Sequence, residues 1–295
     1  MTIEFHAQDG TLLRGRLITA TQPKAAVLLN PGTAVKTGFY VPFAQFLAEQ
    51  GYHVLLWNYR GFGESRHGSL KGSSILFSDI GRRDIPAAIA KAQELFADLP
   101  LYCIGHSAGG QQFGFAPNCN KVSGLITVGS STGYFGGMPL SYRLKAHLFF
   151  KVISPLSTAL FGYVKASSLK LMEDLPPKLA QEWGRWCSKE KFMFDPEFVA
   201  SYNGEPYYHD YQFPVHAITA DDDEIATPAN SAGLWKHIKS SQPITFTCYK
   251  SADMPNQAIG HFNYFRRSHQ RIWRDIVTQL ELFEAARKAG KPSDA

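Results

Sequence analysis

Short apolar runs that alternate with helix-like stretches are the feature that most restricts how this chain can fold. Each run is apolar along its whole length, which is typical of strands covered on both faces. Helical spacing marks FYVPFAQFLAEQ (39–50) and a stretch from Asp84, the expected N-cap, to Phe96. The pattern predicts an α/β fold with a mainly parallel sheet and helices on both faces. The apolar runs are AAVLLN (25–30), HVLLWNY (53–59), LYCIG (101–105), VSGLITVG (122–129) and VHAITA (215–220).

The two ends of the chain bring the expected sheet to eight strands. TIEFHAQD (2–9) and LLRGRLITA (12–20) alternate apolar and polar residues on either side of a turn at Asp9-Gly10, which predicts an antiparallel hairpin. After the last of the buried runs, we expect a helix near Pro228 and a strand at ITFTCY (244–249). A long helix from about residue 263 to residue 288 should end the chain.

The alternation stops between residues 134 and 213. That segment holds 17 of the chain's 39 aromatic residues. We interpret it as an inserted, mostly helical lid, with residues 1–133 and 214–295 forming the α/β core. Its most apolar run, 146–164, is interrupted by Lys151 and Pro155, so we do not expect a membrane-spanning helix. Docking of this run on a membrane surface is a further hypothesis, which flotation of a variant with Phe149 and Phe150 replaced would test.

Two matches to the pattern G-x-S-x-G compete for the role of nucleophile. Ser107 lies in GHSAG, after the run LYCIG and before AGGQQFGF, which can form a short helix. A nucleophilic serine on a strand-to-helix elbow needs that context and small neighbours. Ser131 lies in GSSTG, but the glycines and proline of TGYFGGMPL disrupt any helix after it. We therefore prefer Ser107 and interpret Ser131 as part of a turn at the entrance to the lid.

A nucleophilic serine also needs a histidine and a carboxylate. For a serine on a G-x-S-x-G elbow, the chain order is Ser, then Asp or Glu, then His. His261, in AIGHFNYF, directly precedes the last expected helix and is the best placed histidine. The carboxylate is expected in ITADDDEIATP, on the loop after VHAITA. In the usual form of this loop, two spacer residues separate a small residue from the acid. Counting from Ala220 as the small residue selects Asp223, and Asp222 remains the alternative.

Two backbone amides are expected to stabilise the negative charge that develops on a carbonyl oxygen during acyl transfer. One is the amide of Ala108, directly after the nucleophile. The other should come from PGTAVKTGFY, the loop after AAVLLN. Pro31 has no N–H, so Thr33 is our first choice and Ala34 our second.

Composition and charge argue against several other classes of protein. The net charge of +5 is small for 295 residues, and the densest basic cluster fits the solvated face of the last helix, so no nucleic-acid partner is expected. The four cysteines show no metal-ligand spacing, and neither a metal nor a cofactor is expected. Reduced thiols and the absence of an apolar core in MTIEFHAQDG favour a cytosolic chain. The basic cluster is Arg266, Arg267, Arg271 and Arg274, and the cysteines are Cys103, Cys119, Cys187 and Cys248.

Several segments resemble the α/β-hydrolase superfamily, and more narrowly a group of bacterial serine hydrolases related to the serine-aminopeptidase and lysophospholipase-like branch. The resemblance implies the fold, a serine hydrolase mechanism and the roles of Ser107, Asp223 and His261. The chain departs from many relatives in having Asn30-Pro31-Gly32 where they have His-Gly. The matching segments are NYRGFGES (58–65), GHSAGGQ (105–111), DLPPKLAQEWGRWC (174–187), the DDDE loop and IGHFNYFR (259–266).

Hydrolysis of a small, apolar carboxylic ester through an acyl-enzyme is the leading hypothesis, because the aromatic residues of the expected lid suit an apolar group. Amide hydrolysis, thioester hydrolysis and acyl transfer use the same three residues and stay open. A binding or scaffold protein that retains the hydrolase fold without catalysis is the alternative from another class.

Overall fold

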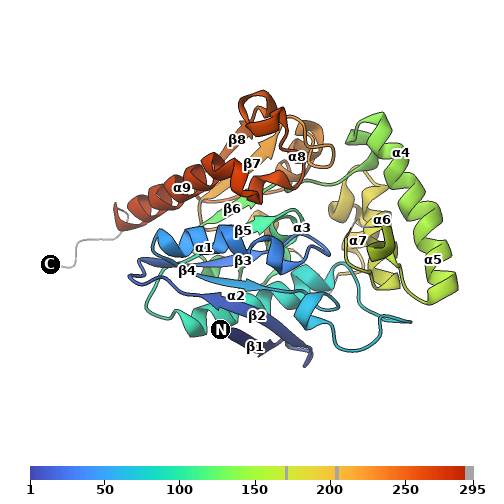
Figure 1. Cartoon of the computed structure of the whole chain (residues 1–295), viewed down its shortest axis with the longest axis horizontal. Helices are drawn as coiled ribbons and strands as arrows, with labels where there is room; N and C mark the ends of the chain where they lie inside the picture. The colour runs from blue at the N-terminus through green and yellow to red at the C-terminus, as the bar shows by residue number, and fades with distance from the viewer. Residues whose placement is uncertain (170–171, 203–205, 290–295) are drawn as a thin grey trace.

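An eight-stranded sheet forms the centre of the computed structural model, which describes residues 1–169, 172–202 and 206–289 (Figure 1). The spatial order is β1-β2-β4-β3-β5-β6-β7-β8. β1 pairs antiparallel with β2 and β2 antiparallel with β4, whereas all later neighbours are parallel. The predicted hairpin and the mainly parallel sheet are therefore confirmed. The strands are β1 Thr2–His6, β2 Leu12–Ile18, β3 Ala25–Asn30, β4 Tyr52–Trp57, β5 Leu101–His106, β6 Leu125–Val128, β7 Val215–Ala220 and β8 Ile244–Tyr249.

Helices cover both faces of the sheet, as predicted. Side chains alternate along β3, so that Val27 and Leu29 pack with α1 and α9 on one face. Ala26 and Leu28 face the other way and belong to the same apolar cluster as the buried side of α2. Burial on both faces explains why the central strands carry apolar residues at every position. The helices of this core are α1 Val41–Glu49, α2 Ile85–Leu95, α3 Ala108–Gln111, α8 Pro228–Trp235 and α9 Gln270–Ala289.

Among the described residues, four further α-helices lie between β6 and β7, and we call residues 134–213 the α4–α7 segment. A π-helical turn at Phe149–Ile153 joins the first two into one long helix at the outer edge of the molecule (Figure 1). Residues 170–171 and 203–205 of this segment, and 290–295 of the expected core, lie outside the described residues. In the described ranges, none of the helices combines the length and apolar character that crossing a bilayer requires. The four helices are α4 Leu140–Leu148, α5 Ser154–Phe161, α6 Pro177–Cys187 and α7 Pro196–Val199.

Phe149 and Phe150 face the interior, so these two side chains are not the ones through which the run 146–164 could contact a membrane. Phe149 is 8 % exposed. The ring of Phe150 packs edge-on against Trp183, with ring centroids 5.1 Å apart. Burying these rings against α6 removes them from water and explains their direction.

The motif EWGRWC attaches α6 to the α/β core. The ring of Trp183 stacks on Phe77 of the core, with centroids 5.2 Å apart, and Trp186 is fully buried against the same phenylalanine. The carboxylate of Glu182 accepts hydrogen bonds from the amide (2.8 Å) and the hydroxyl (3.1 Å) of Ser78. The motif therefore holds the α4–α7 segment by aromatic packing and by a pair of hydrogen bonds.

Two expectations about helix ends are wrong. The last helix begins at Gln270 and not near Asn263, because Arg266 has an extended backbone (ψ 144°) and short 3₁₀ turns lie on either side of it. α2 does follow Asp84, but the Asp84 side chain makes no capping bond. A π-helical turn precedes the helix, and the carboxylate of Asp84 is paired with Arg60 instead.

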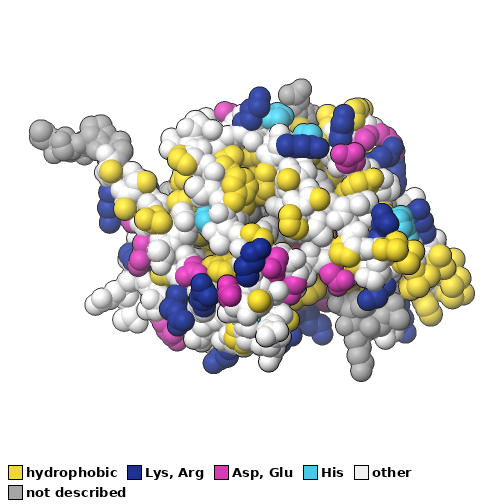
Figure 2. Space-filling model, turned by 90° about the horizontal axis from the view of Figure 1, so that it is seen from above, with side chains coloured by type: hydrophobic (Ala, Val, Ile, Leu, Met, Phe, Trp, Pro, Cys, Tyr) yellow, Lys and Arg dark blue, Asp and Glu magenta, His cyan; other side chains and the backbone are white. Residues whose placement is uncertain are grey.

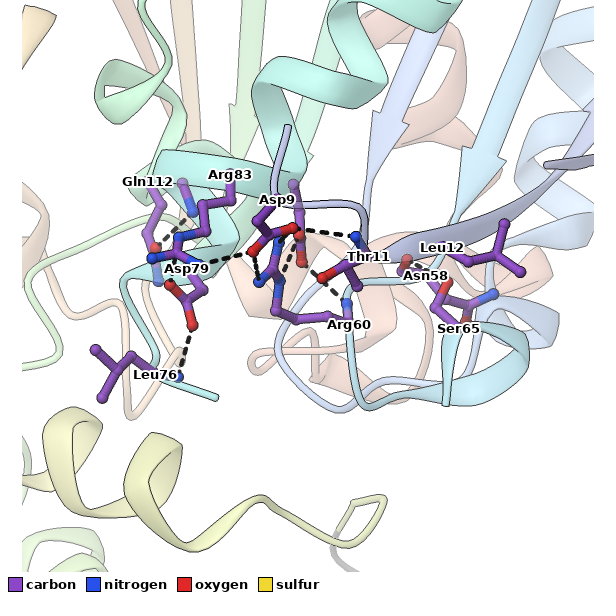
Figure 3. Close-up of polar contacts among 12 residues, drawn as sticks. Asp9, Thr11, Leu12, Asn58, Arg60, Ser65, Leu76, Asp79, Arg83 and Gln112 are labelled. Atoms are coloured by element: carbon purple, nitrogen blue, oxygen red, sulfur yellow. Dashed lines mark hydrogen bonds and ion pairs between the residues drawn. The ribbon is translucent and has the colours of Figure 1, made fainter. Parts of the chain in front are cut away.

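Arg60, from the motif NYRGFGES, forms the central buried ion pair of the core. Its Nε donates to Asp84 Oδ1 (2.6 Å) and its backbone amide donates to Asp84 Oδ2 (2.9 Å). The guanidinium also binds Asp9 in the β1–β2 turn (2.7 Å), which Arg83 binds from the other side (2.7 Å) (Figure 3). Although partial burial opposes this effect, the two arginines hold the pKa of Asp9 well below its usual range. The network ties the hairpin, the loop after β4 and the start of α2 together.

We expect Arg60→Met to lower the free energy of unfolding by about 3–5 kcal/mol, because it leaves a buried carboxylate without its partner. Burial raises the pKa of Asp84 to about 7 even beside Arg60, so urea unfolding should be measured at alkaline pH. The matched control is Arg14→Met, which breaks the exposed pair with Glu4 and should cost no more than about 1 kcal/mol. An equal decrease in the free energy of unfolding of the two variants would contradict the special role of the buried pair of Arg60 with Asp84.

Candidate active site

Ser107 lies on a sharp turn between β5 and α3. Its backbone has φ 50° and ψ −116°, a strained conformation typical of a nucleophile elbow. A Cβ atom on Gly105 would lie 2.4 Å from the amide nitrogen of Gly110, and one on Gly109 would lie 2.5 Å from the carbonyl oxygen of Asn30. The small residues around Ser107 are therefore required by close packing of the turn against its own helix and against β3.

Ser131, the competing serine, lies in a different environment. Its hydroxyl donates to the carbonyl oxygen of Ile225 (3.4 Å) and accepts from the amide of Gly133 (3.2 Å). The chain then continues into a 3₁₀ turn at Phe135–Gly137, and no α-helix starts before Leu140. These contacts suit a residue that fixes the turn leading into the α4–α7 segment.

His261 lies between Ser107 and Asp223. Its Nε2 is 3.0 Å from Ser107 Oγ, and its Nδ1 is 2.9 Å from Asp223 Oδ2. The side chains of His261 and Asp223 are 8 % and 0 % exposed. Burial alone would raise the pKa of Asp223, but His261 and the amides of Ile225 and Ala226 keep it below its ordinary value. Asp223 can therefore stay ionised next to the imidazole.

Asp222 has a different set of contacts. Its Oδ2 accepts from the amide of Ile259 (2.8 Å), and its Oδ1 accepts from the amide of Gly260 (3.0 Å). The carboxylate therefore holds the backbone directly before His261, and Asp223 reaches the ring itself. The two neighbouring aspartates have separate roles in positioning one histidine.

The loop after β3 and the elbow present backbone amides that are free of protein acceptors. The amides of Thr33 and Ala108 make no hydrogen bond within the described part of the chain. The amide of Gly32, by contrast, donates to the hydroxyl of Tyr40 (2.8 Å). Ala34, the second candidate, has a positive φ of 57° in the same turn.

A chain of buried hydrogen bonds runs behind the site from this loop to His261. The Tyr40 oxygen is 2.7 Å from Nδ1 of His106, and Nε2 of His106 is 2.9 Å from the carbonyl oxygen of His261. A carbonyl can only accept, so Nε2 carries the proton, and Nδ1 accepts from the Tyr40 hydroxyl. The Tyr40 oxygen accepts in turn from Gly32. Each of these three hydrogen bonds therefore has a defined donor and a defined acceptor.

Comparison with known proteins identifies the family. Residues 21–211 match the family described as serine aminopeptidase, S33. The chain belongs to this family of α/β-hydrolases. The matched region includes Ser107, but it ends before Asp223 and His261. The family match therefore does not cover these two residues, and their candidate roles rest on the contacts of His261 with Ser107 and with Asp223.

This S33-family chain is similar in sequence to a human lipase and similar in fold to solved structures of a lipase and an esterase. Human monoglyceride lipase is 26 % identical over 152 residues, which are 51 % of this chain and 43 % of the human protein, so the match spans less than half of that relative. A soluble variant of monoglyceride lipase from Saccharomyces cerevisiae has a TM-score of 0.67 at 15 % identity, covering 95 % of this chain and 94 % of that chain. An esterase from Pyrococcus furiosus has a TM-score of 0.61 at 15 % identity, covering 96 % and 90 %. At these identities the solved structures establish the fold alone.

Sequence reasoning missed Tyr40 and His106. His106 is the variable residue of the G-x-S-x-G pattern, and its position directly before Ser107 was a signal that a second histidine lies near the site. Tyr40 carries no such signal, because its partner Gly32 is eight residues away in a loop whose path depends on the fold. Within this S33-family site, the two residues connect the loop after β3 with the loop that carries His261.

We expect His106 to make the folded protein sensitive to acid. Burial and the neighbouring His261 lower the pKa of His106 from 6.5 to about 3. Between these values the unfolded chain binds a proton that the folded chain does not, so stability decreases as the pH falls. Urea unfolding between about pH 6 and about pH 4 should show about 1 kcal/mol more loss per pH unit in the wild type than in His106→Gln. Equal slopes would contradict a neutral, buried His106.

Proposed function

We propose that this chain is a serine hydrolase that cleaves small carboxylic esters through an acyl-enzyme intermediate. The observation that carries the proposal is the line of contacts from Ser107 Oγ through His261 to Asp223, at 3.0 Å and 2.9 Å. Histidine makes the serine hydroxyl nucleophilic by accepting its proton, and the carboxylate stabilises the charged imidazole. Membership of the S33 family supports a hydrolytic reaction.

The three side chains have complementary roles in both half-reactions. His261 Nε2 accepts the proton as Ser107 Oγ bonds to the ester carbonyl carbon, and the same nitrogen returns the proton to the departing alcohol. A water molecule then gives a proton to Nε2 and attacks the acyl carbon. The bond from this carbon to Ser107 Oγ breaks as Nε2 returns the proton to Oγ, which releases the carboxylic acid and restores the serine hydroxyl. Asp223 accepts the Nδ1–H throughout and so keeps Nε2 facing the serine.

In this proposal, the amides of Ala108 and Thr33 stabilise the negative charge that develops on the carbonyl oxygen. Both amides are free of acceptors within the described residues, and the neighbouring amide of Gly32 already binds Tyr40. Ala34 remains the alternative to Thr33. Loss of one such donor costs about 3 kcal/mol of transition-state stabilisation in related reactions.

An ester is preferred to other acyl compounds for two reasons. Human monoglyceride lipase is a sequence relative, and the segment next to the site is rich in aromatic side chains that suit an apolar acyl or alcohol group. Amide, thioester and acyl-transfer reactions use the same residues, and the family description refers to an aminopeptidase. A non-catalytic binding protein is the weaker alternative, because a paired imidazole and serine serve no purpose in simple binding.

In this proposal the α4–α7 segment acts as a lid over the acyl site. The amide of Glu173 donates to the carbonyl oxygen of Ala34 (3.0 Å), so the segment touches the candidate oxyanion loop. The hydroxyl of Thr227, on the loop that carries Asp223, donates to the carbonyl oxygen of Gly137 (2.8 Å), so the beginning of the segment also touches this loop. A cytosolic location also stays a prediction, supported by four free cysteines.

Labelling with a fluorophosphonate probe tests the nucleophile directly. We expect the wild type to be labelled on Ser107 and to hydrolyse p-nitrophenyl esters, with a preference among acyl lengths. Ser107→Ala should lose the label and lower kcat by about a thousandfold or more, because no other hydroxyl lies beside His261 Nε2 among the described contacts. Peptide mapping of the adduct identifies the residue.

Ser131→Ala is the matched control and should retain both labelling and turnover. The aspartates are separated in the same assay: Asp223→Asn should lower kcat by about 10³- to 10⁴-fold, since it favours the wrong tautomer of His261. Asp222→Asn should have a smaller effect, because its backbone contacts can be replaced in part by the amide oxygen. An adduct on Ser131, or none on the wild type, contradicts the proposed function.

A further inference from the structure

An unbroken row of apolar side chains faces water along the α4–α5 helix. These six residues, spaced four apart, are 52–67 % exposed, and we call them the leucine stripe. The opposite side of the helix packs inward through residues such as Ala146, Phe149 and Phe150. Figure 2 shows hydrophobic side chains gathered with basic ones at the edge of the molecule where Figure 1 draws α4 and α5. The leucine stripe is Leu140, Leu144, Leu148, Val152, Leu156 and Leu160.

The π-helical turn at Phe149–Ile153 helps to keep this row on one face. In a regular α-helix a step of four residues overshoots a full turn by about 40°, so five steps would carry the row about 200° around the axis. A π-helical turn holds more residues per turn and removes part of that rotation. The stripe extends over about 30 Å. An ordinary protein surface exposes leucines singly, whereas these side chains form one continuous apolar patch.

The charged residues of the α4–α5 helix itself all have one sign. Residues 140–161 contain Arg143, Lys145, His147 and Lys151 but no aspartate or glutamate. Lys145 and Lys151 are exposed. An apolar row bordered by cations suits an interface with acyl chains and anionic headgroups.

We propose that the leucine stripe docks this protein on the surface of membranes that contain anionic lipids, with the α4–α5 helix lying parallel to the surface. The apolar side chains would leave water for the acyl region, while the long lysine side chains reach the headgroups. The inference depends on the exposed face of the helix and is independent of the role of Ser107.

A second copy of the chain is a poorer occupant of the same face. Two stripes packed against each other in antiparallel fashion would bring Lys145 and Lys151 of one copy close to the cations of the other. Residues 140–161 offer no carboxylate to offset that repulsion. Charge complementarity therefore favours an anionic lipid surface.

Vesicle flotation tests the docking surface with the full chain. We expect the wild type to float with vesicles of phosphatidylcholine and phosphatidylglycerol and much less with phosphatidylcholine alone. The triple variant Leu144→Ser, Leu148→Ser, Val152→Ser should lower partitioning by roughly tenfold or more, because three exposed apolar side chains are removed. The pair Lys145→Gln, Lys151→Gln should lose the preference for phosphatidylglycerol.

Leu282→Ser is the matched control, because Leu282 is 58 % exposed on α9 and lies off the stripe. It should float like the wild type, and circular dichroism should show that all variants are folded. Three results would overturn the proposal: no flotation of the wild type, equal flotation of the triple variant, or a dimer in light scattering that the triple variant dissociates.

A separate observation concerns the hydrogen-bond chain behind the site. One end is Gly32, directly before Thr33, and the other is the backbone of His261. On the basis of the proposed function, we infer that Tyr40 and His106 are positioning residues that hold the oxyanion loop and His261 at a fixed distance from each other. A displacement of about 1 Å in either group is enough to lower turnover by about a hundredfold.

Tyr40→Phe removes the hydroxyl that joins the two halves of the chain. We expect kcat for a p-nitrophenyl ester and the rate of fluorophosphonate labelling to fall by about ten- to a hundredfold, with KM changed less than about twofold. The matched control is Tyr59→Phe, which removes a buried hydroxyl that donates to the carbonyl oxygen of Pro31 (2.8 Å) in the same loop.

A purely structural role predicts that both variants lose stability and that neither changes kcat selectively. Equal kcat in Tyr40→Phe and Tyr59→Phe would therefore overturn the positioning role. Failure of the proposed function is distinguishable, because the wild type itself would then show no label on Ser107.

Discussion

The parallel pairing of β5 with β3 and β6 is the constraint on which the site depends. Its register places Asn30 opposite Gly105 and Val128 opposite His106, so the three strands end at the same edge of the sheet. The amide of Ser107 continues this pairing by donating to the carbonyl oxygen of Val128 (2.9 Å). The elbow, the loop after β3 and the exit from β6 are therefore brought together by backbone hydrogen bonds that do not depend on the site's own side chains.

Side-chain contacts then fix the loops that the sheet brings together. Asp222 binds the backbone before His261, and His106 binds the carbonyl oxygen of His261 itself. The imidazole is consequently held from its backbone as well as from its ring. Buried polar and charged groups are costly unless they are paired, which explains why both the backbone and the ring of this one histidine have hydrogen-bond partners.

The α4–α7 segment follows a different physical rule from the core. Its inner side is held by aromatic stacking of Trp183 on Phe77 and by Glu182, and its outer side carries the leucine stripe. A helix that lies at the outer edge of the molecule can bury only one of its sides, even where both sides are apolar. The sequence alone cannot say which, since Phe149 and Leu148 are neighbours in the same apolar run.

The sequence by itself determined where the strands lie along the chain, because central strands buried on both faces require apolar runs and the first hairpin requires alternation. It also reduced the proposed triad to Ser107, His261 and one of two aspartates, because the elbow needs small residues and the chain order follows from the expected fold. Tertiary structure alone decided which aspartate reaches the imidazole, what His106 and Tyr40 bind, and where α9 begins. These outcomes depend on contacts between segments far apart in the chain, such as Asp222 with Ile259 and Tyr40 with His106. Local pattern carries no information about such distances.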